Sequence, residues 1–332
     1  MKELQFVAAR HADWAVWDEW LAGRSSNPRK SLPFTAGELP HRYRELCHDL
    51  SLARDRDYSS PLIDSLHERV LHAQQWIYGA TPRWRDTWLQ FLVAGFPETV
   101  RREWRFVLPA LLLFFVPLLL YIPAAHYWPE SVYLVIPSGH AAQFEEMYSP
   151  DAPRLGRMRS DAGDDVAMLG AYIWNNLRLD FQCFAGGLLF GLGSLFYLVY
   201  NGLVIGATAG HLTRLGYIDT FWGFVAGHSG PELIGAVLSG AAGLRIGYAL
   251  IAPGSATRLA ALKRAAKVAI RILYGATAMT FAAAFIEAFW SPLPFVPPML
   301  KYMVGGALWV LLIAYLLLAG RNERSRETID AA

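Results

Sequence analysis

Long apolar stretches alternate with short polar segments from residue 105 onward. A helix needs about 20 mostly apolar residues to cross a hydrocarbon core about 30 Å thick, and about five stretches reach that length. We therefore predict an all-α, polytopic membrane bundle, with a transmembrane domain over residues 105–320 and a cytoplasmic tail over residues 321–332. The apolar stretches cover residues 105–128, 178–212, 220–251, 268–290 and 300–319.

Positive charge gives these stretches a direction, because Lys and Arg are enriched in cytoplasmic segments. Arg101, Arg102 and Arg105 precede the first stretch, and the chain ends in the basic sequence RNERSR and six further residues. Both termini are therefore expected in the cytoplasm. The polar segment 129–177 is then extracytoplasmic, with short helices joined by a loop rich in Pro and Gly.

Two of the stretches are too long for one simple crossing. At about 1.5 Å per residue the second exceeds the bilayer thickness, and Asn201-Gly202 is the predicted break. The third, Thr220 to Ile251, is interrupted by the sequence HSGPE. If His211 to Arg214 and the cations after Pro253 all face the cytoplasm, this stretch is a re-entrant pair of half-helices. One full span is the alternative.

Before the membrane domain, apolar residues recur at three- and four-residue steps, as in amphipathic helices. Thr35-Ala-Gly-Glu38 fits a capping box at the start of one of them. We predict a cytoplasmic domain over residues 1–80, in which three helices bury their apolar stripes against one another. The stripes are Trp14, Trp17 and Leu21; Leu39, Tyr43, Leu46, Leu50 and Ala53; and Ile63, Leu66, Val70, Ala73 and Ile77.

Residues 81–104 join the two domains and carry Trp84, Trp88 and Phe91 on one helical face, with arginines at both ends. Aromatic rings favour the headgroup level and arginines favour the anionic leaflet, so this pattern predicts an amphipathic interfacial elbow helix. An ordinary packed helix of the soluble domain is the alternative.

Composition supports the membrane assignment, since 54% of the 332 residues are apolar and the formal net charge is only +2. A general nucleic-acid binder needs a strongly basic face, so no nucleic-acid partner is expected. Cys47 lies in the polar region and Cys183 heads an apolar run, so we expect no disulfide or cysteine metal site. The first residues lack the order of a secretory signal.

His228 and Glu232 are the main candidate intramembrane site, because ionisable side chains at membrane depth are expensive and usually functional. On a helix they share a face and could share a proton or bind one metal ion. Glu287 is a further candidate for this site and the only plausible acidic third ligand in a span, but its helical rise places it toward the outer face, so it need not meet His228. We therefore predict no metal and no cofactor. Ser229-Gly-Pro-Glu232 also fits a capping box, in which Glu232 only caps a helix.

Other polar residues have simpler expected roles. Asn201 is a further candidate for the intramembrane site, or a hydrogen-bonding contact between helices. Arg245 is expected to extend toward the cytoplasmic headgroups. An outer polar collar is expected at the entry of the second span, formed by Asn175, Asn176, Arg178 and Asp180.

Glycines at four-residue spacing predict close helix packing. This packing serves either a homodimer interface or contacts inside one protomer. The residues are Gly202, Gly206 and Gly210, together with Gly243 and Gly247.

The sequence has no Gly-x-Gly-x-x-Gly or Walker-type phosphate loop and no His-Glu-x-x-His zinc motif. Nucleotide chemistry is therefore unsupported. Because no nucleophile can be identified either, we expect a non-enzyme rather than an enzyme.

Three blocks carry a family resemblance: Asn175-Asn176, FAGGLLFGLGSLFYLVYNGLVIG from Phe184, and GHSGPELIGAVLSGAAGLRIG from Gly227. They resemble the stage II sporulation protein M family, and RYRELCHDLSLARD extends the resemblance over most of the chain. The resemblance implies a multi-pass protein of the bacterial inner membrane. It also implies a role near that of the sporulation member, which works in a complex with peptidoglycan-degrading partners.

The leading hypothesis is therefore a scaffold or assembly subunit of a cell-envelope complex, dimeric, with membrane lipids and envelope or peptidoglycan-remodelling proteins as partners. A transporter or channel with a polar site at His228 and Glu232 is the alternative. An intramembrane enzyme that uses Glu232 as a general base comes third.

Overall fold

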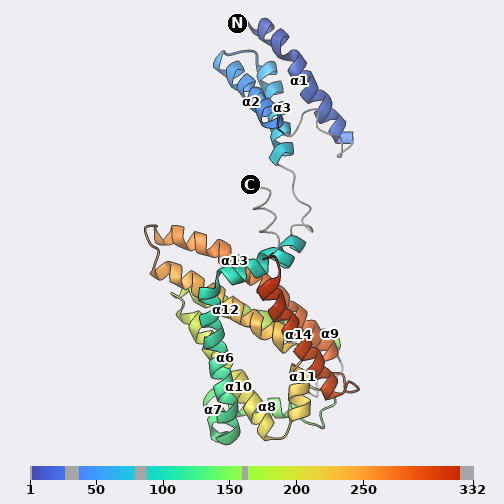
Figure 1. The fold of residues 1–332 in the computed structure, drawn as a ribbon, viewed down its shortest axis with the longest axis vertical. Helices are drawn as coiled ribbons and strands as arrows, with labels where there is room; N and C mark the ends of the chain where they lie inside the picture. The colour runs from blue at the N-terminus through green and yellow to red at the C-terminus, as the bar shows by residue number, and fades with distance from the viewer. Residues whose placement is uncertain (1, 27–36, 79–87, 159–163, 322–332) are drawn as a thin grey trace. The chain divides into compact units, whose positions relative to one another are not determined.

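The protein is all-helical in the residues that the computed structural model describes, which are 2–26, 37–78, 88–158 and 164–321; no strand occurs among them. The chain divides into two compact units, Met1–Thr87 and Trp88–Ala332 (Figure 1). We call them the N-terminal unit and the membrane unit, and each is described by itself.

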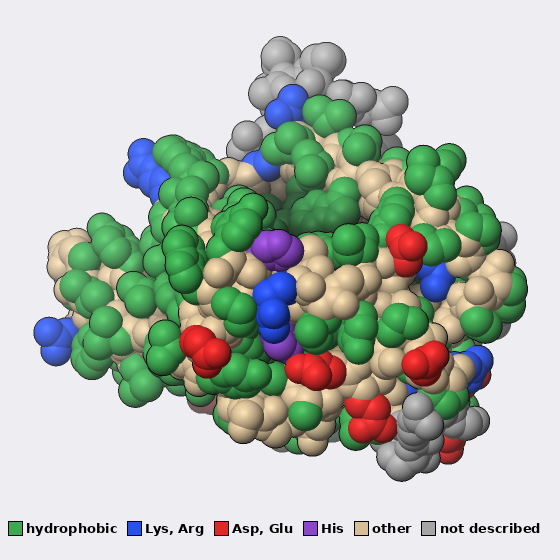
Figure 2. Space-filling view, turned by 90° about the horizontal axis from the view of Figure 1, so that it is seen from below, with side chains coloured by type: hydrophobic (Ala, Val, Ile, Leu, Met, Phe, Trp, Pro, Cys, Tyr) green, Lys and Arg blue, Asp and Glu red, His purple; other side chains and the backbone are tan. Residues whose placement is uncertain are grey.

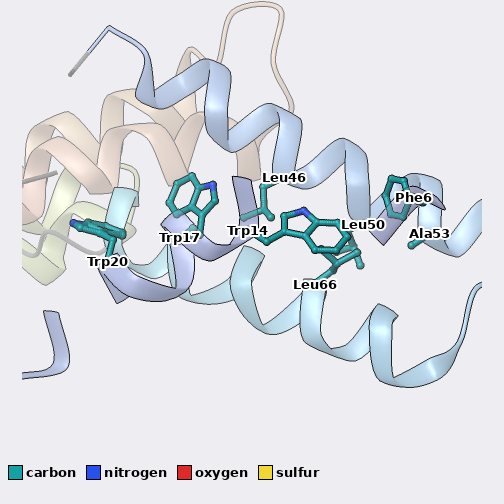
Figure 3. Close-up of a cluster of buried hydrophobic side chains, with 9 residues drawn as sticks. Phe6, Trp14, Trp17, Trp20, Leu46, Leu50, Ala53 and Leu66 are labelled. Atoms are coloured by element: carbon teal, nitrogen blue, oxygen red, sulfur yellow. The ribbon is translucent and has the colours of Figure 1, made fainter. Parts of the chain in front are cut away.

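The N-terminal unit is built from three helices around a core of large side chains (Figure 3). Trp14 and Trp17 are buried, as are Leu46 and Leu66, so the predicted apolar stripes are confirmed. The side chains of Leu21 and Ile77, and all of Thr35, lie outside the described residues. Glu38 is the residue before the second helix and makes no side-chain cap. The helices are α1 (Glu3–Ser26), α2 (Leu39–Asp55) and α3 (Ser60–Tyr78).

Ion pairs connect these helices at the edge of the core. The buried Asp49 carboxylate of α2 accepts hydrogen bonds from Arg10 Nε and Trp14 Nε1 of α1, both at 2.9 Å. Arg69 of α3 donates to both carboxylate oxygens of Asp18 at 2.7 Å. Each pair joins two helices, so the polar contacts fix the same arrangement as the core.

The membrane unit contains the long apolar helices. Five of the helices in the described part of the chain are long and apolar enough to cross a membrane, among them α6 at the position predicted for the first span. The elements are η1 (Phe91–Gly95), α5 (Phe96–Arg102), α6 (Trp104–Tyr127), η2 (Pro129–Ser131), α7 (Val132–Val135), α8 (Ser138–Tyr148), α9 (Asp165–Ala185), η4 (Gly186–Leu188), α10 (Leu192–Arg214), η5 (Ile218–Trp222), α11 (Gly223–Val225), α12 (Ser229–Ile251), α13 (Arg258–Phe285), η6 (Ile286–Trp290) and α14 (Pro298–Leu318).

The helices α6 and α10 lie side by side and run in the same direction (Figure 1). Glycines on α10 face backbone carbonyls of α6, where any Cβ would collide. The pairs advance together along both helices: Gly202 with Phe114, Gly206 with Leu118 and Gly210 with Ile122. Because α6 and α10 run in the same direction, the chain between them must cross back, and α9 is the long helix that does so.

The turn between α9 and α10 lies at residues 186–191, where Phe190 and Gly191 have positive φ angles of 54° and 83°. The predicted break at Asn201-Gly202 is therefore wrong, since both residues lie within α10. The helix that contains the start of the second apolar stretch begins at Asp165 rather than near Arg178. The helix α9 therefore starts inside the segment 129–177. The turn packs on α12, with Gly187 against Gly243 and Gly191 against Gly247. These glycine faces, like those of α10, serve packing inside one protomer.

The membrane unit has two chemically different ends. At one, Arg101 donates to the carbonyls of Leu316 and Ala319 at 2.8 and 2.7 Å, and Arg245 lies 2.8 Å from Glu103. Arg245 is thus paired with a carboxylate. We call this the basic end; it carries Arg101, Arg102, Arg105, Arg245, Arg258, Lys263, Arg264 and Lys267. The opposite loop end carries Tyr127, residues 129–158 and the first residues of α9, α12 and α14.

The helix α12 crosses from the loop end to the basic end without interruption. It is continuous over 23 residues and antiparallel to α13, with His228 beside Ser291 and Gly235 against Ala276. The re-entrant prediction is therefore wrong and the full-span alternative holds. Its charge argument failed because α10, parallel to α6, carries His211 and Arg214 to the loop end.

The segment 88–102 is helical but not one regular helix, because the π-helix η1 precedes α5. Phe96 is fully buried against Gly275, while Trp88 is exposed. Trp84 lies outside the described residues. The interfacial position of this elbow stays a prediction.

Candidate functional site

Three ionisable side chains meet inside the membrane unit near its loop end. His228 Nε2 lies 3.8 Å from Glu232 Oε2. The potential ligand atoms of His228, Glu232 and Glu287 all lie within 4.8 Å of one another. His228 is 4% exposed and Glu287 is 9% exposed. We call these three residues the His-Glu-Glu cluster.

Local backbone structure brings Glu287 to this position. The helix α13 continues into the π-helical turn η6, which holds Glu287, and such turns are frequent at functional sites. Since α12 begins at the loop end, His228 lies level with the end of α13 rather than deep in a re-entrant segment. The structure therefore brings Glu287 beside His228, which helical rise alone did not require.

The capping-box alternative for Glu232 is also wrong. The residue before α12 is His228, and no side chain caps this helix. Ser229 Oγ instead accepts a hydrogen bond from Trp309 Nε1 at 3.1 Å. The Glu232 carboxylate thus faces His228 and has no capping role.

Polar neighbours hold the cluster in place. His228 Nδ1 lies 2.9 Å from Ser291 Oγ, and Lys301 Nζ donates to the Ser291 carbonyl at 2.7 Å. Asn176 Nδ2 donates to Glu287 Oε2 at 3.2 Å. These bonds come from three further parts of the chain, α9, α14 and the loop after η6, so the cluster is supported on several sides.

Asp180 lies one turn beyond Asn176 on α9 and is fully buried. The Thr280 and Ser239 hydroxyls lie beside its carboxylate, and in the described part of the chain no Lys or Arg pairs with it. It lines a cavity of about 20 Å³ together with Asn201, Glu232 and Thr280, and this is room for about one water molecule. The cavity links Glu232 to a second, deeper carboxylate.

The predicted outer collar does not form. Asn176 and Asp180 face the interior of the bundle, whereas Asn175 and Arg178 are exposed on the other side of α9. Arg178 donates to Asn175 Oδ1 at 3.4 Å. Residues 172, 176 and 180 share one helical face, and this four-residue spacing is the signal that could have identified Asp180 as an interior residue.

Aromatic side chains cover the cluster from the loop end. The Phe224 ring of α11 lies edge-on to His228 with the ring centroids 5.2 Å apart, and Tyr148 packs against Phe224. Gly156 lies under the Phe224 ring with a φ of 76°, where a Cβ would collide with the ring. Burial raises the pKa of the Tyr148 phenol, so this cover is uncharged at neutral pH.

Hydrogen bonds from Arg157 hold the loop after α8 against η6. Arg157 is 1% exposed and donates to Asp165 Oδ1 and to the Ala288 carbonyl, both at 2.6 Å. Ala288 directly follows Glu287, so the loop after α8 is anchored beside the cluster.

Figure 2 shows the surface seen from below, where acidic and basic side chains lie among hydrophobic ones.

The cluster can hold a cation or exchange protons, since it offers one imidazole and two carboxylates. Ser291 and His228 resemble a nucleophile and base, but Ser291 is fully buried. A substrate carbonyl therefore has no access to this hydroxyl in this conformation, and hydrolytic chemistry is not supported.

Comparison with known proteins gives two matches to protein families. Residues 4–79 match a domain of unknown function (DUF8413). No curated protein and no solved structure matches the chain. Residues 110–292, which include the whole His-Glu-Glu cluster, Asp180 and Asn201, match the model of stage II sporulation protein M. The chain, a multi-pass membrane protein by its apolar helices, therefore belongs to the stage II sporulation protein M family.

Proposed function

We propose that this protein is a membrane transporter whose His-Glu-Glu cluster binds a small cation. The observation that carries the proposal is the meeting of two carboxylates and an imidazole inside a bundle of membrane helices, with His228 and Glu287 buried and Glu232 partly exposed. Ionisable groups inside a bundle of membrane helices are costly, and they commonly mark ion pathways. Helix packing alone does not require them.

The surroundings of the cluster fit a transport pathway. The helical run from η5 through α11 breaks at residues 226–228 before α12 begins, and interrupted helices often build transporter sites. The cavity beside Glu232 leads to Asp180, which supplies a second station for a cation. Toward the basic end the turn at residues 186–191 packs tightly on α12, and at the loop end aromatic rings cover the cluster. Transport therefore requires the two closures to open in turn.

The test is cation flux into proteoliposomes that contain the purified full-length chain. Glu232→Gln and Glu287→Gln are expected to lower flux roughly tenfold or more, because each removes a charge from the cluster. Glu130→Gln is the matched control, since Glu130 is exposed in η2. Equal flux in all four proteins, or no flux above empty vesicles, would contradict the proposal.

The second candidate is a scaffold or assembly subunit of an envelope complex. It is favoured by the separate N-terminal unit, which offers a docking surface of its own, and by the family resemblance. Crosslinking followed by purification of the wild type and of His228→Ala/Glu232→Gln separates the two functions. A scaffold retains its envelope partners and its cellular phenotype in the double variant. A transporter loses the phenotype while its partners stay unchanged.

The membrane and the orientation belong to the same proposal. We place the basic end, and with it both termini, in the cytoplasm of a bacterial inner membrane, because Lys and Arg cluster there. Single cysteines at Glu130 and Arg258 in a cysteine-free chain test this. A membrane-impermeant maleimide applied outside should label the first and spare the second.

A further inference from the structure

We propose that the His-Glu-Glu cluster is a binding site for a divalent transition-metal ion of the Zn²⁺ and Mn²⁺ class. This inference names the cation for the transport site proposed above. It rests on the proposed function only for the claim that the metal is transported. Binding itself is an independent claim.

The distances suit direct coordination. Tetrahedral sites with metal–ligand bonds of about 2.1 Å have ligand atoms about 3.4 Å apart. His228 Nε2 and Glu232 Oε2 lie 3.8 Å apart, and Glu287 completes a triangle with no side longer than 4.8 Å. Small side-chain rotations close the triangle around one ion. Water can complete the coordination sphere, as in sites that keep an open position.

The hydrogen bonds of the three side chains also support a metal site. A ligating histidine usually donates its second ring N–H to an oxygen, which fixes the free nitrogen toward the metal. His228 Nδ1 lies 2.9 Å from Ser291 Oγ, which leaves Nε2 on the side of Glu232. Asn176 Nδ2 holds Glu287 Oε2 in a similar way. The cluster therefore has the supporting contacts that metal ligands need.

Charge balance gives a third and independent argument. In the described part of the chain no Lys or Arg pairs with Glu232 or Glu287, and the nearby Lys301 ammonium is bound to a backbone carbonyl. Asp180 lies on the same cavity as Glu232, and in the described part of the chain no Lys or Arg pairs with it either. A divalent cation neutralises two carboxylates at once, and burying a neutral assembly is far less costly than burying its separate charges.

The ligand set selects the class of metal. One imidazole with carboxylates suits Zn²⁺, Mn²⁺ or Fe²⁺, while Cu⁺ prefers sulfur and Mg²⁺ and Ca²⁺ prefer oxygen alone. Cys183, fully buried at the other end of α9, bonds through its carbonyl to Ser194 and takes no part. We therefore expect Mg²⁺ in excess not to displace the bound ion.

The test measures metal bound to the full-length protein in detergent after chelator treatment and reloading with Zn²⁺, and the visible spectrum after loading with Co²⁺. The wild type should bind about one ion per chain and give the visible bands of Co²⁺ in a site with nitrogen and oxygen ligands. His228→Ala and Glu287→Gln should each weaken binding by at least roughly 10- to 100-fold, the loss typical even for a residue that only supports a ligand. The controls are His140→Ala and Glu130→Gln, both exposed at the loop end.

The outcomes separate this inference from the proposed function. Unchanged Zn²⁺ binding in His228→Ala and Glu287→Gln would overturn the metal site. Proton flux without any bound Zn²⁺, Mn²⁺ or Co²⁺ would also overturn it and leave the transport function standing. Cluster-dependent metal binding without flux in vesicles would support the site and remove the transport function.

Discussion

The N-terminal unit and the membrane unit are both helical bundles, yet opposite kinds of side chain hold them together. In the N-terminal unit Phe6, Trp14, Trp17 and Trp20 fill the space between three helices. In the membrane unit the tightest contacts are glycines against backbone, as where α10 meets α6. Many of its large hydrophobic side chains point outward; Leu119 and Leu120, for example, are 62% and 67% exposed.

The solvent explains this difference. In water, large apolar side chains gain most by burial, at about 25 cal/mol for each Å² removed from water. In a bilayer the surroundings are as apolar as leucine, so burial gains little and helices associate through close van der Waals contact, which small residues permit. The same reasoning explains why polar groups in the membrane unit gather inside, while most charged residues of the N-terminal unit lie at its surface and the buried Asp49 is paired with Arg10.

The largest expected effect follows from removing a large side chain from the N-terminal unit. Trp14→Ala should lower the free energy of unfolding of the fragment 1–87 by about 3–5 kcal/mol, because the indole is 4% exposed and donates to Asp49. Urea unfolding followed by circular dichroism measures this loss. We expect the unchanged fragment to unfold cooperatively on its own, because its core is complete within the unit.

Leu4→Ala is the matched control for that experiment. Leu4 is 84% exposed, so the same kind of truncation should change stability by less than about 0.5 kcal/mol. If both substitutions had equal effects, large side chains would not hold this unit together and the contrast between the units would fail.

The next largest effect comes from the reverse change in the membrane unit. Gly206→Leu adds a side chain where even a Cβ would lie 2.6 Å from the Leu118 carbonyl oxygen. The two helices must separate, which should cost about 1–3 kcal/mol or more. The melting temperature of the detergent-solubilised full chain, read by size-exclusion chromatography after heating, should fall accordingly.

Gly306→Leu makes the identical substitution in α14 at a position where a Cβ meets nothing within 4 Å. Its melting temperature should stay at the wild-type value or rise, because leucine favours helix formation over glycine. Equal losses at positions 206 and 306 would mean that helix propensity or detergent, rather than close packing, explains the first result.

The sequence alone predicted the features that depend on local pattern. Amphipathic spacing located the stripes of α2 and α3, and apolar length located α6, because each of these signals lies within one helix. The direction of α10 and α12 depends on which helices pack together, and local charge counts misled there. The sequence did not predict α9 as a separate long helix, because Asn176, Arg178 and Asp180 lower its apolar character.

The candidate site was predicted in part for the same reason. His228 and Glu232 are four residues apart, so their meeting follows from helical geometry. Glu287 joins them through an antiparallel helix pair and a π-helical turn, and neither can be derived from spacing in one sequence. Asp180 is predicted in an outer collar because the linear sequence places it with Arg178 at the entry of the second span.

The smallest expected effect lies at the water-facing edge of the N-terminal unit, where electrostatics should respond to pH. Hydrogen bonds from the Ser59 hydroxyl at 2.5 Å and the Ser59 N–H at 2.9 Å lower the pKa of Glu3 below its usual 4.5. A lowered folded-state pKa contributes stability above the unfolded value, and this contribution is lost as pH falls through the folded value.

Ser59→Ala in the fragment 1–87 should therefore lower the melting temperature by at most a few degrees at pH 7, because the group is exposed to solvent. The difference from the wild type should shrink below about pH 4.5 and vanish once Glu3 is protonated in both proteins. Ser51→Ala, an exposed serine of α2, should show no such trend. A difference that stayed constant from pH 7 to pH 3 would assign the effect of Ser59 to helix capping or packing, because neither requires the charge on Glu3.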